Sequence, residues 1–159
     1  MIKILFVCHG NICRSPMAQF VMEYLVGKRG LNGSFHIDSK ATSTEEIGNP
    51  PYPPARRKMQ EEGIPMRAHR ASQITRSDYE KFDLIIGMDG ANIRNMLMIF
   101  GGDPDHKIYK LREFTGTTED IADPWYTGNF DITYDQVLAG CTALLDRLEE
   151  SDSGNQTRI

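Results

Sequence analysis

The sequence predicts an α/β protein with a three-layer, doubly wound architecture, in which a four-stranded parallel sheet is flanked by helices. Three observations predict it. Short apolar runs of strand length alternate along the chain with longer segments whose apolar residues recur at helical spacing. That alternation is typical of a parallel sheet covered on both faces and joined by right-handed crossovers. Polar residues capable of chemistry follow the apolar runs, and such sheets bind ligands at the carboxyl ends of their strands.

The first expected strand is the apolar run 2–7, and a turn over residues 8–15 follows it. Pro16 then occupies a position suited to the first turn of a helix. The helix is expected to end near Gly27 or Gly30. Its apolar stripe, spaced i, i+3, i+4, i+7 and i+8, consists of Met17, Phe20, Val21, Tyr24 and Leu25.

A strand, a loop and a helix are expected next. Residues 35–41 have the composition of a second strand, and the proline-rich run 49–54 indicates a surface loop. Pro54 is expected to open a helix that runs through Glu62 and stops at Gly63.

A short helix capped by Thr75 or Ser77 is expected before the third strand, which the apolar run 82–88 marks. Asp89 follows that run directly. Because an aspartate carboxylate accepts hydrogen bonds from the free N–H groups of a first helical turn, Asp89 is expected to cap a helix that ends near Phe100.

Residues 107–111 are expected to form the fourth strand, and a long polar loop separates it from a last helix. The apolar stripe of that helix consists of Val137, Leu138, Cys141, Leu144, Leu145 and Leu148. Residues 1–150 are therefore expected to form a single domain. The polar segment 151–159 has no capping signal and is expected to be a disordered tail.

Composition limits the classes of function. The chain has 159 residues, of which 40% are hydrophobic and 25% charged, as is typical of an ordinary globular domain. A formal net charge of -4 argues against a nucleic-acid partner, and no apolar stretch approaches the roughly 18 residues of a membrane span. The three cysteines, an odd number, do not indicate a secreted disulfide framework. We therefore expect a cytoplasmic protein with no membrane or nucleic-acid partner, while its oligomeric state stays open.

The turn over residues 8–15 reads Cys-His-Gly-Asn-Ile-Cys-Arg-Ser. A turn between a strand and a helix presents backbone N–H groups that bind anions. Gly10 is expected to supply backbone freedom, and Asn11 tolerates a left-handed backbone. Arg14 can hold two phosphate oxygens in its planar fork. The helix N-terminus and Arg14 also favour the thiolate of Cys8, which makes this cysteine a candidate nucleophile.

Each of these residues alone has a plainer interpretation. A cysteine that ends a buried strand is more often a small apolar residue, and an arginine in a first helical turn is usually solvated. Neither explains why both flank a glycine-containing turn. The turn lacks the G-x-x-x-x-G-K-[ST] pattern of nucleotide P-loops, and Cys8, His9 and Cys13 lack the C-x-x-C spacing of a zinc site. The sequence thus predicts an anion site with a nucleophile, and no metal or cofactor.

The pattern C-x5-R-[ST] in a first strand–helix turn resembles the low-molecular-weight protein tyrosine phosphatases. Residues 10–16 match that family's signature position by position, and the resemblance extends from Ile2 to about Leu148. It implies a hydrolase for phosphotyrosine, with a tyrosine-phosphorylated protein as substrate. It also implies a phosphate-binding loop made of His9, Gly10, Asn11, Ile12, Cys13 and Ser15. His9 departs from the family, in which leucine is more usual.

A phosphate leaving group needs a proton, so such an enzyme requires a general acid. Asp123 lies in the polar loop before the last helix, in an Asp-Pro-Trp-Tyr segment. An Asp-Pro pair alone is an ordinary turn signal, but the resemblance implies that this aspartate is the acid. Cys8 then attacks phosphorus, Arg14 stabilises the equatorial oxygens, and Asp123 protonates the leaving oxygen. Water hydrolyses the resulting phosphocysteine with Asp123 as base.

The resemblance also implies supporting residues. Asn11, Ser39 and His69 match a hydrogen-bond network that holds the loop in shape, and Asp89 matches a residue that orients the arginine. Without the resemblance, His69 equally indicates a solvated loop histidine and Asp89 a simple helix cap. Ser15 is expected to donate a hydrogen bond to the nucleophilic sulfur.

The substrate pocket is expected to contain Glu45, Trp125 and Tyr126. In well-known members of the family a tryptophan stands where Glu45 does, and an aromatic ring there packs against phosphotyrosine. Glu45 cannot make that contact and would repel an acidic substrate, although its plainer role is that of a solvated loop charge. The preference for aryl phosphates is therefore expected to depend on Trp125 and Tyr126.

The other two cysteines have different expected roles. Cys13 lies five residues after Cys8 and is either a packing residue or, as the resemblance implies, a disulfide partner that protects the nucleophile from oxidation. Cys141 lies on the apolar stripe of the last helix and is expected to belong to the core.

Three other functions compete with that of a tyrosine phosphatase. Protein-arginine phosphatases resemble this chain but tend to carry threonine where Ile12 stands. Arsenate reductases share the loop but require two further redox cysteines, and only Cys141 remains. A non-catalytic phosphate-binding module would lack the nucleophile or the acid, whereas Cys8 and Asp123 are both present. A tyrosine phosphatase is the best-supported prediction.

Overall fold

The computed structural model describes residues 1–151 and confirms the predicted α/β class. The strands are β1 (Ile2–Cys8), β2 (Phe35–Ala41), β3 (Leu84–Gly87) and β4 (Ile108–Lys110). They form one sheet in the order β2-β1-β3-β4, and all three strand pairs are parallel. The chain moves outward from β1 to β2 and then crosses back to β3. The crevice at the carboxyl ends of β1 and β3 is therefore the place where this kind of sheet binds ligands.

The sequence of β1 explains its central position. Ile4, Leu5, Phe6 and Val7 are all fully buried. Successive strand residues point to opposite faces, and these four divide accordingly between two hydrophobic clusters. A strand that is apolar on both faces requires a layer of helices on each side.

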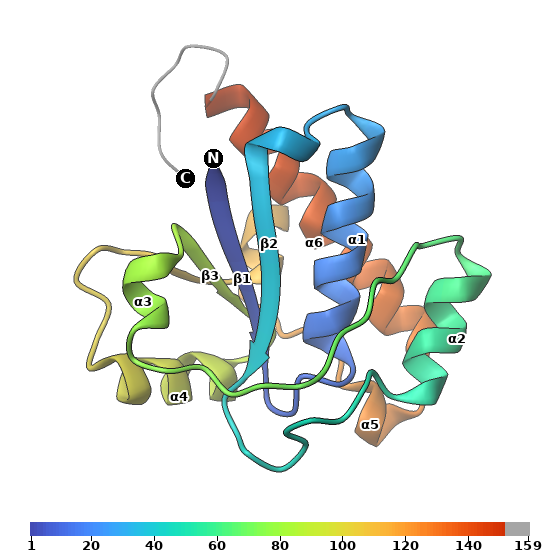
Figure 1. Cartoon of the computed structure of the whole chain (residues 1–159), viewed down its shortest axis with the longest axis horizontal. Helices are drawn as coiled ribbons and strands as arrows, with labels where there is room; N and C mark the ends of the chain where they lie inside the picture. The colour runs from blue at the N-terminus through green and yellow to red at the C-terminus, as the bar shows by residue number, and fades with distance from the viewer. Residues whose placement is uncertain (152–159) are drawn as a thin grey trace.

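Helices cover both faces of the sheet (Figure 1). On one face lie α1 (Arg14–Lys28) and α6 (Phe130–Glu150), and on the other lie α3 (Asp78–Lys81) and α4 (Gly90–Phe100). The remaining helical segments are η1 (Asn32–Ser34), α2 (Pro53–Glu61), η2 (Leu111–Thr115) and α5 (Pro124–Thr127). In Figure 1 the arrow of β2 points toward the end of the molecule at which α5 lies.

The helices that border the functional region are longer than their apolar stripes indicated. α1 already begins at Arg14, so Pro16 is its third residue and still lies in the first turn, where no backbone N–H is needed. α6 begins at Phe130 because the side chain of Asn129 accepts a hydrogen bond from the Ile132 N–H (3.1 Å). The stripe starts later, since the first turn of α6 is largely exposed.

Two further local features differ from expectation. The one-turn helix α5 was not predicted, although its signals are present: Asp123 caps it, Pro124 is its first residue, and Gly128 follows it in a left-handed conformation. The predicted hydroxyl cap of α3 is wrong, because neither Ser77 nor Thr75 caps it through a side chain. Instead, a buried carboxylate organises this corner.

Asp78 is that carboxylate. It accepts hydrogen bonds from the Thr75 N–H (2.8 Å) and from the Lys40 ammonium (3.0 Å). A charged acceptor binds an N–H more strongly than a hydroxyl does, and the lysine compensates its burial. The end of β2 is thereby joined to α3.

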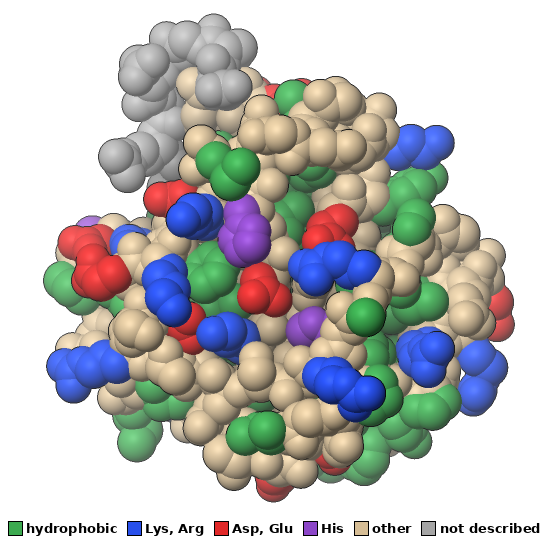
Figure 2. All heavy atoms as spheres, viewed as in Figure 1, with side chains coloured by type: hydrophobic (Ala, Val, Ile, Leu, Met, Phe, Trp, Pro, Cys, Tyr) green, Lys and Arg blue, Asp and Glu red, His purple; other side chains and the backbone are tan. Residues whose placement is uncertain are grey.

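None of the helices within residues 1–151 is long and apolar enough to cross a membrane. Basic and acidic side chains are interspersed on the face shown in Figure 2. The expected tail begins at Ser151, which still has helical backbone angles, and residues 152–159 lie outside the described residues. The single domain over residues 1–150 stays a prediction.

Gly140 of α6 packs directly against Leu111 of η2. A β-carbon added there would lie 2.5 Å from Cγ of the fully buried Leu111. We expect Gly140→Ala to lower the free energy of unfolding by about 1–3 kcal/mol through overpacking, although alanine is the better helix former. In a Leu111→Ala background the same substitution is expected to raise it. Urea denaturation measures both changes, and equal destabilisation in the two backgrounds would contradict this packing argument.

Candidate active site

The turn over residues 8–15 connects the carboxyl end of β1 to the first residues of α1. Asn11 has a φ of 60°, whereas Gly10 does not lie in the left-handed region. The left-handed position that bends this turn is therefore Asn11, whose short polar side chain tolerates it. A β-carbon at Gly10 would meet Cγ of Glu46 at 3.4 Å, so the absence of a side chain leaves room for the neighbouring loop.

Three hydrogen-bond donors surround the Cys8 sulfur. Ser15 Oγ lies 3.0 Å from Sγ, the Asn11 N–H donates at 3.3 Å and the Ser15 N–H donates at 3.4 Å. Two of these donors are backbone groups of the turn and of the first turn of α1. Hydrogen bonds of this kind stabilise the charged form of an acceptor. The turn is thus arranged to hold a thiolate at Cys8.

A network of side chains fixes the direction of these hydrogen bonds. Asn11 Nδ2 donates to Ser15 Oγ (2.8 Å), so the hydroxyl hydrogen of Ser15 is free to point at the sulfur. Asn11 Nδ2 also donates to Ser39 Oγ (3.0 Å), which donates in turn to Gln19 Oε1 (2.6 Å). His69 Nε2 lies 3.0 Å from Asn11 Oδ1, and because an amide oxygen can only accept, Nε2 carries the hydrogen. The three residues expected in a network are therefore joined in one.

The two cysteines of the turn have different environments. Burial raises the pKa of Cys13 to about 12, and the neighbouring Cys8 adds to the effect. Cys13 is thus a neutral thiol at physiological pH, while the donors converge on Cys8. Cys141 is fully buried on α6, where its sulfur faces the Ala18 carbonyl, and burial raises its pKa as well. Its expected place in the core is correct.

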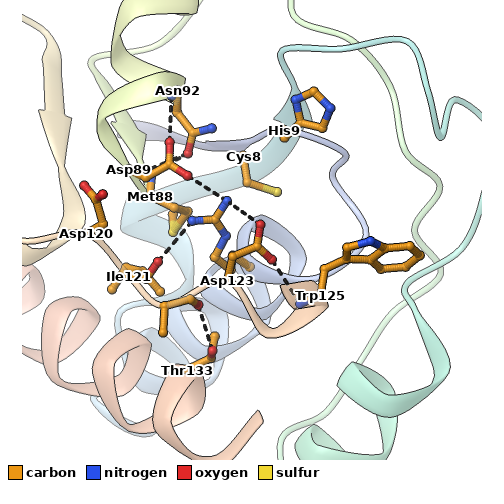
Figure 3. A network of polar contacts seen from close by, with 12 residues as sticks. Cys8, His9, Met88, Asp89, Asn92, Asp120, Ile121, Asp123, Trp125 and Thr133 are labelled. Carbon is orange, nitrogen blue, oxygen red and sulfur yellow. Dashed lines mark hydrogen bonds and ion pairs between the residues drawn. The ribbon is translucent and has the colours of Figure 1, made fainter. Parts of the chain in front are cut away.

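Arg14 connects the turn to the other side of the crevice. Its Nη1 donates to the Ile121 carbonyl (3.1 Å), and its Nη2 lies 2.9 Å from Asp89 Oδ2 and 3.4 Å from Asp123 Oδ2. Only 3% of the side chain is exposed. Burial opposes the charged form, but Cys8 and the two carboxylates hold the pKa of Arg14 above its ordinary value. Figure 3 shows Cys8, Asp89 and Asp123 gathered around one centre.

Asp89 performs two tasks with its two oxygens. Oδ1 accepts from the Asn92 N–H (2.8 Å) and so caps α4, while Oδ2 faces Arg14. The Asn92 side chain accepts from the Asp89 N–H (3.1 Å), which closes a reciprocal capping box. The simple cap and the contact with the arginine therefore coexist, and the cap fixes the carboxylate that holds the guanidinium.

Each oxygen of the Asp123 carboxyl group has a partner. Its Oδ1 accepts from the Trp125 N–H (3.1 Å), as the N-cap of α5. Its Oδ2 faces Arg14 at 3.4 Å, and 29% of the side chain is exposed. The backbone has φ −88° and ψ 108°, the extended conformation expected before Pro124. The second oxygen is thus directed into the crevice.

A cavity of about 360 Å³ opens above these groups. Glu45 and Glu46 form one wall, three residues of α4 form the second, and Trp125 and Tyr126 form the third. His9 and Glu45 meet across the rim at 2.7 Å, and both are largely exposed. Trp125 and Tyr126 are also exposed, by 55% and 85%. Figure 3 shows His9 and Trp125 farther from the centre than Cys8 and Asp123.

The expected pocket residues all line this cavity, and sequence reasoning missed others. The wall from α4 consists of Ala91, Asn92 and Asn95. Asn92 had a signal in the sequence, since asparagine three residues after the predicted cap Asp89 fits a reciprocal cap. No local pattern marks Ala91 and Asn95. They reach the cavity because α4 begins directly beside it.

The burial of His69 predicts that the stability of the protein depends on pH. Burial lowers the pKa of His69 below its ordinary value of 6.5. The unfolded chain therefore binds this proton at a higher pH than the folded protein, so the free energy of unfolding is expected to fall as the pH drops through 6.5. In His69→Gln, whose amide can still donate to Asn11, the fall is expected to be smaller. Denaturation curves between about pH 7.5 and 5 test this, and identical slopes would refute it.

Comparison with known proteins shows to which family the chain is similar. A family model described as low molecular weight phosphotyrosine protein phosphatase matches residues 3–154. The chain is 37% identical over 152 residues to the low molecular weight protein-tyrosine-phosphatase YfkJ of Bacillus subtilis, covering 94% of this chain and 97% of that protein. It is 40% identical over 150 residues to the low molecular weight phosphotyrosine protein phosphatase of Rattus norvegicus, covering 91% and 94%.

Solved structures agree with these relatives. The crystal structure of YfkJ superposes with a TM-score of 0.92 at 37% identity, covering 95% of this chain and 96% of that one. An arginine phosphatase from drosophila superposes with a TM-score of 0.83 at 30% identity, covering 93% and 98%. The family model and both sequence relatives span more than nine-tenths of this chain, and the chain therefore belongs to the low molecular weight phosphotyrosine protein phosphatase family.

Proposed function

We propose that this protein hydrolyses phosphotyrosine in proteins, with Cys8 as nucleophile and Asp123 as general acid and base. One observation carries the proposal: the Cys8 sulfur, the Arg14 guanidinium and the Asp123 carboxyl group line the same cavity at the carboxyl end of β1. Each role in a phosphoryl transfer through cysteine has a candidate there. Family membership supports the same reaction.

In the first step the Cys8 thiolate attacks phosphorus, so that an S–P bond forms while the bond from phosphorus to the phenolic oxygen breaks. Arg14 and the N–H groups of the turn stabilise the equatorial oxygens. Asp123 gives its proton to the departing oxygen. Arg14 is held more closely by Asp89 (2.9 Å) than by Asp123 (3.4 Å). This difference supports a division of labour in which Asp89 keeps the arginine in place and Asp123 serves the leaving group.

In the second step water attacks the phosphocysteine, and Asp123 takes the water proton as general base. The S–P bond breaks and the sulfur leaves as a thiolate. The hydroxyl of Ser15 (3.0 Å from Sγ) supports that departure by donating a hydrogen bond to the sulfur. Its orientation comes from Asn11, which donates to the same oxygen.

The pocket supports phosphotyrosine as the substrate group. Trp125 and Tyr126 offer aromatic surface for a ring, and Ile12 packs with Cys13 and Ala71 in a small apolar cluster at the base of the turn. A protein-arginine phosphatase is the second candidate, because the drosophila arginine phosphatase has a closely similar structure. The apolar Ile12 favours the first candidate. Cys141, fully buried in α6, is poorly placed for the redox chemistry of an arsenate reductase.

The substrate is a tyrosine-phosphorylated protein, the protein works in the cytoplasm, and neither nucleic acid nor a membrane is a partner. Asn11, Ser39 and His69 keep the turn in shape, and Asp89 orients the arginine. The hydrogen-bond network around Asn11 supports the first of these roles, and the contact between Asp89 and Arg14 supports the second.

Two substitutions test the proposed reaction. We expect Cys8→Ser to abolish turnover of p-nitrophenyl phosphate and of a phosphotyrosine peptide, because a serine hydroxyl is not ionised at neutral pH. Asp123→Asn is expected to lower kcat/KM for the peptide by roughly 10²- to 10³-fold, since the amide cannot supply the proton. Cys141→Ala removes a thiol remote from the cavity and is expected to retain activity. Full activity of Cys8→Ser would refute the mechanism.

The same assay separates the two substrate candidates. Wild-type protein is expected to turn over a phosphotyrosine peptide faster than a phosphoarginine peptide of the same sequence. The reverse preference would establish the arginine phosphatase instead, with the nucleophile and acid unchanged.

Glu45 predicts a preference among peptide sequences. Its exposed carboxylate at the cavity rim is expected to favour lysine and disfavour glutamate beside the phosphotyrosine. We expect Glu45→Gln to lower the ratio of kcat/KM for lysine-flanked over glutamate-flanked peptides by about two- to fivefold, the effect of one exposed charge pair. High salt should reduce the wild-type ratio. Glu80→Gln, which removes an exposed charge on α3, should leave it unchanged. An unaltered ratio in Glu45→Gln would contradict the prediction.

A further inference from the structure

Tyr52 connects the two halves of the active site although it belongs to neither. It is the residue immediately before α2. Its backbone N–H donates to the Ile12 carbonyl of the phosphate-binding loop (2.8 Å). Its ring packs against the Trp125 indole, with ring centroids 5.0 Å apart and planes inclined at 53°. That separation and tilt are favourable for an aromatic pair. One half-buried residue thus contacts both the loop of the nucleophile and the helix that Asp123 caps.

Trp125 helps to position the Asp123 carboxyl group, whose other oxygen, Oδ2, faces Arg14 at 3.4 Å. The Trp125 N–H is the donor that holds Asp123 Oδ1 (3.1 Å). α5 has only four residues, and Pro124 is the one that is buried, so few contacts hold this helix in place. Trp125 is itself 55% exposed. Its contact with Tyr52 is one of the contacts that hold the helix in place.

The chain on the other side of Asp123 is anchored separately. Ala122 accepts a hydrogen bond from Thr133 Oγ1 at its carbonyl (2.8 Å) and donates its N–H to Gln136 Oε1 (2.7 Å). Both partners lie on α6. Asp123 thus lies between a fixed residue before it and Trp125 after it, and Trp125 is the one that packs against Tyr52.

Tyr52 is itself held in place by contacts with α6. Its ring also packs against Phe130, with centroids 6.3 Å apart, at the start of α6. Farther along α2, Lys58 pairs with Asp131 (2.7 Å) in the first turn of α6. Tyr52 and α2 are thereby connected to the first turn of α6 at two points, and the ring of Tyr52 can serve as a fixed surface for Trp125.

We propose that Tyr52 is a positioning residue for the general acid. Its ring holds Trp125, and through the Trp125 N–H it keeps the Asp123 carboxyl group on the leaving-group side of the cavity. This inference rests on the proposed function, in which Asp123 protonates the leaving oxygen. Because Tyr52 is also tied to the phosphate-binding loop at Ile12, it sets the acid relative to the nucleophile.

The test compares two leaving groups. p-Nitrophenolate is a weak base and departs with little help from a proton, whereas phenolate is a strong base and needs the acid. We expect Tyr52→Ala to lower kcat/KM for phenyl phosphate about tenfold more than for p-nitrophenyl phosphate. Tyr52→Phe, which keeps the ring, is expected to restore both values to within about twofold of wild type. A purely structural role would lower both substrates alike.

Further variants make the outcome decisive. Tyr24→Ala truncates another half-buried tyrosine that packs on the same core, away from the cavity, and is expected to treat the two substrates equally. Tyr52→Leu keeps apolar bulk without a ring, and it replaces Tyr52→Ala should that variant fail to fold. Equal losses for both substrates in the folded Tyr52 variant would overturn the inference.

Asp123→Asn separates this inference from the proposed function. If Asp123→Asn discriminates between the two leaving groups and the Tyr52 variant does not, only the inference fails. If Asp123→Asn itself does not discriminate, the assignment of the general acid fails, and the role of Tyr52 fails with it.

Discussion

Arg14 carries a positive charge in the first turn of α1, where almost none of its side chain reaches solvent, and a charge buried this deeply must be paired. The partners come from distant parts of the chain: Asp89 after β3, and Asp123 and the Ile121 carbonyl before α6. Removing either carboxylate would leave the buried charge of Arg14 less well compensated. The ion pairs and the hydrogen bond of this single guanidinium therefore hold α1, α4 and the segment before α6 together around the cavity.

The same pairing explains how the site accommodates a phosphate. Arg14 already faces two carboxylates and a sulfur, so an incoming anion competes with groups of its own charge. Asp89 is fixed through its cap on α4, whereas Asp123 lies farther from the guanidinium and is partly exposed. In the proposed reaction the phosphate therefore takes the place of Asp123 on the arginine. The carboxyl group that is displaced is the one required at the leaving oxygen.

The sequence predicted those parts of the molecule whose causes are local. A few consecutive residues determine each of these features, namely the strands, the octet from Cys8 to Ser15 and the cap at Asp89. Asp123 emerged only through family resemblance, because an Asp-Pro pair by itself indicates no more than a turn. Tyr52 had no signal at all: it follows two prolines in a loop, and its importance arises from Trp125, which approaches it only in the folded chain. The start of α6 was missed for a related reason, since its exposed first turn lacks the apolar pattern that marks the rest.

The walls of the cavity couple recognition to chemistry in this chain. His9 and Glu45 make one side of the rim polar, so the aromatic surface for a substrate ring comes from α5 alone. The same four-residue helix is capped by Asp123, the proposed acid. A ring that packs against Trp125 therefore presses on the residue whose N–H holds the acid. In a pocket with a second aromatic wall, one loop could contact the substrate ring while another positions the acid. Here the contact between Tyr52 and Trp125 supports both the aromatic wall and the position of the acid. A substrate that displaces Trp125 therefore also moves Asp123, its proton donor.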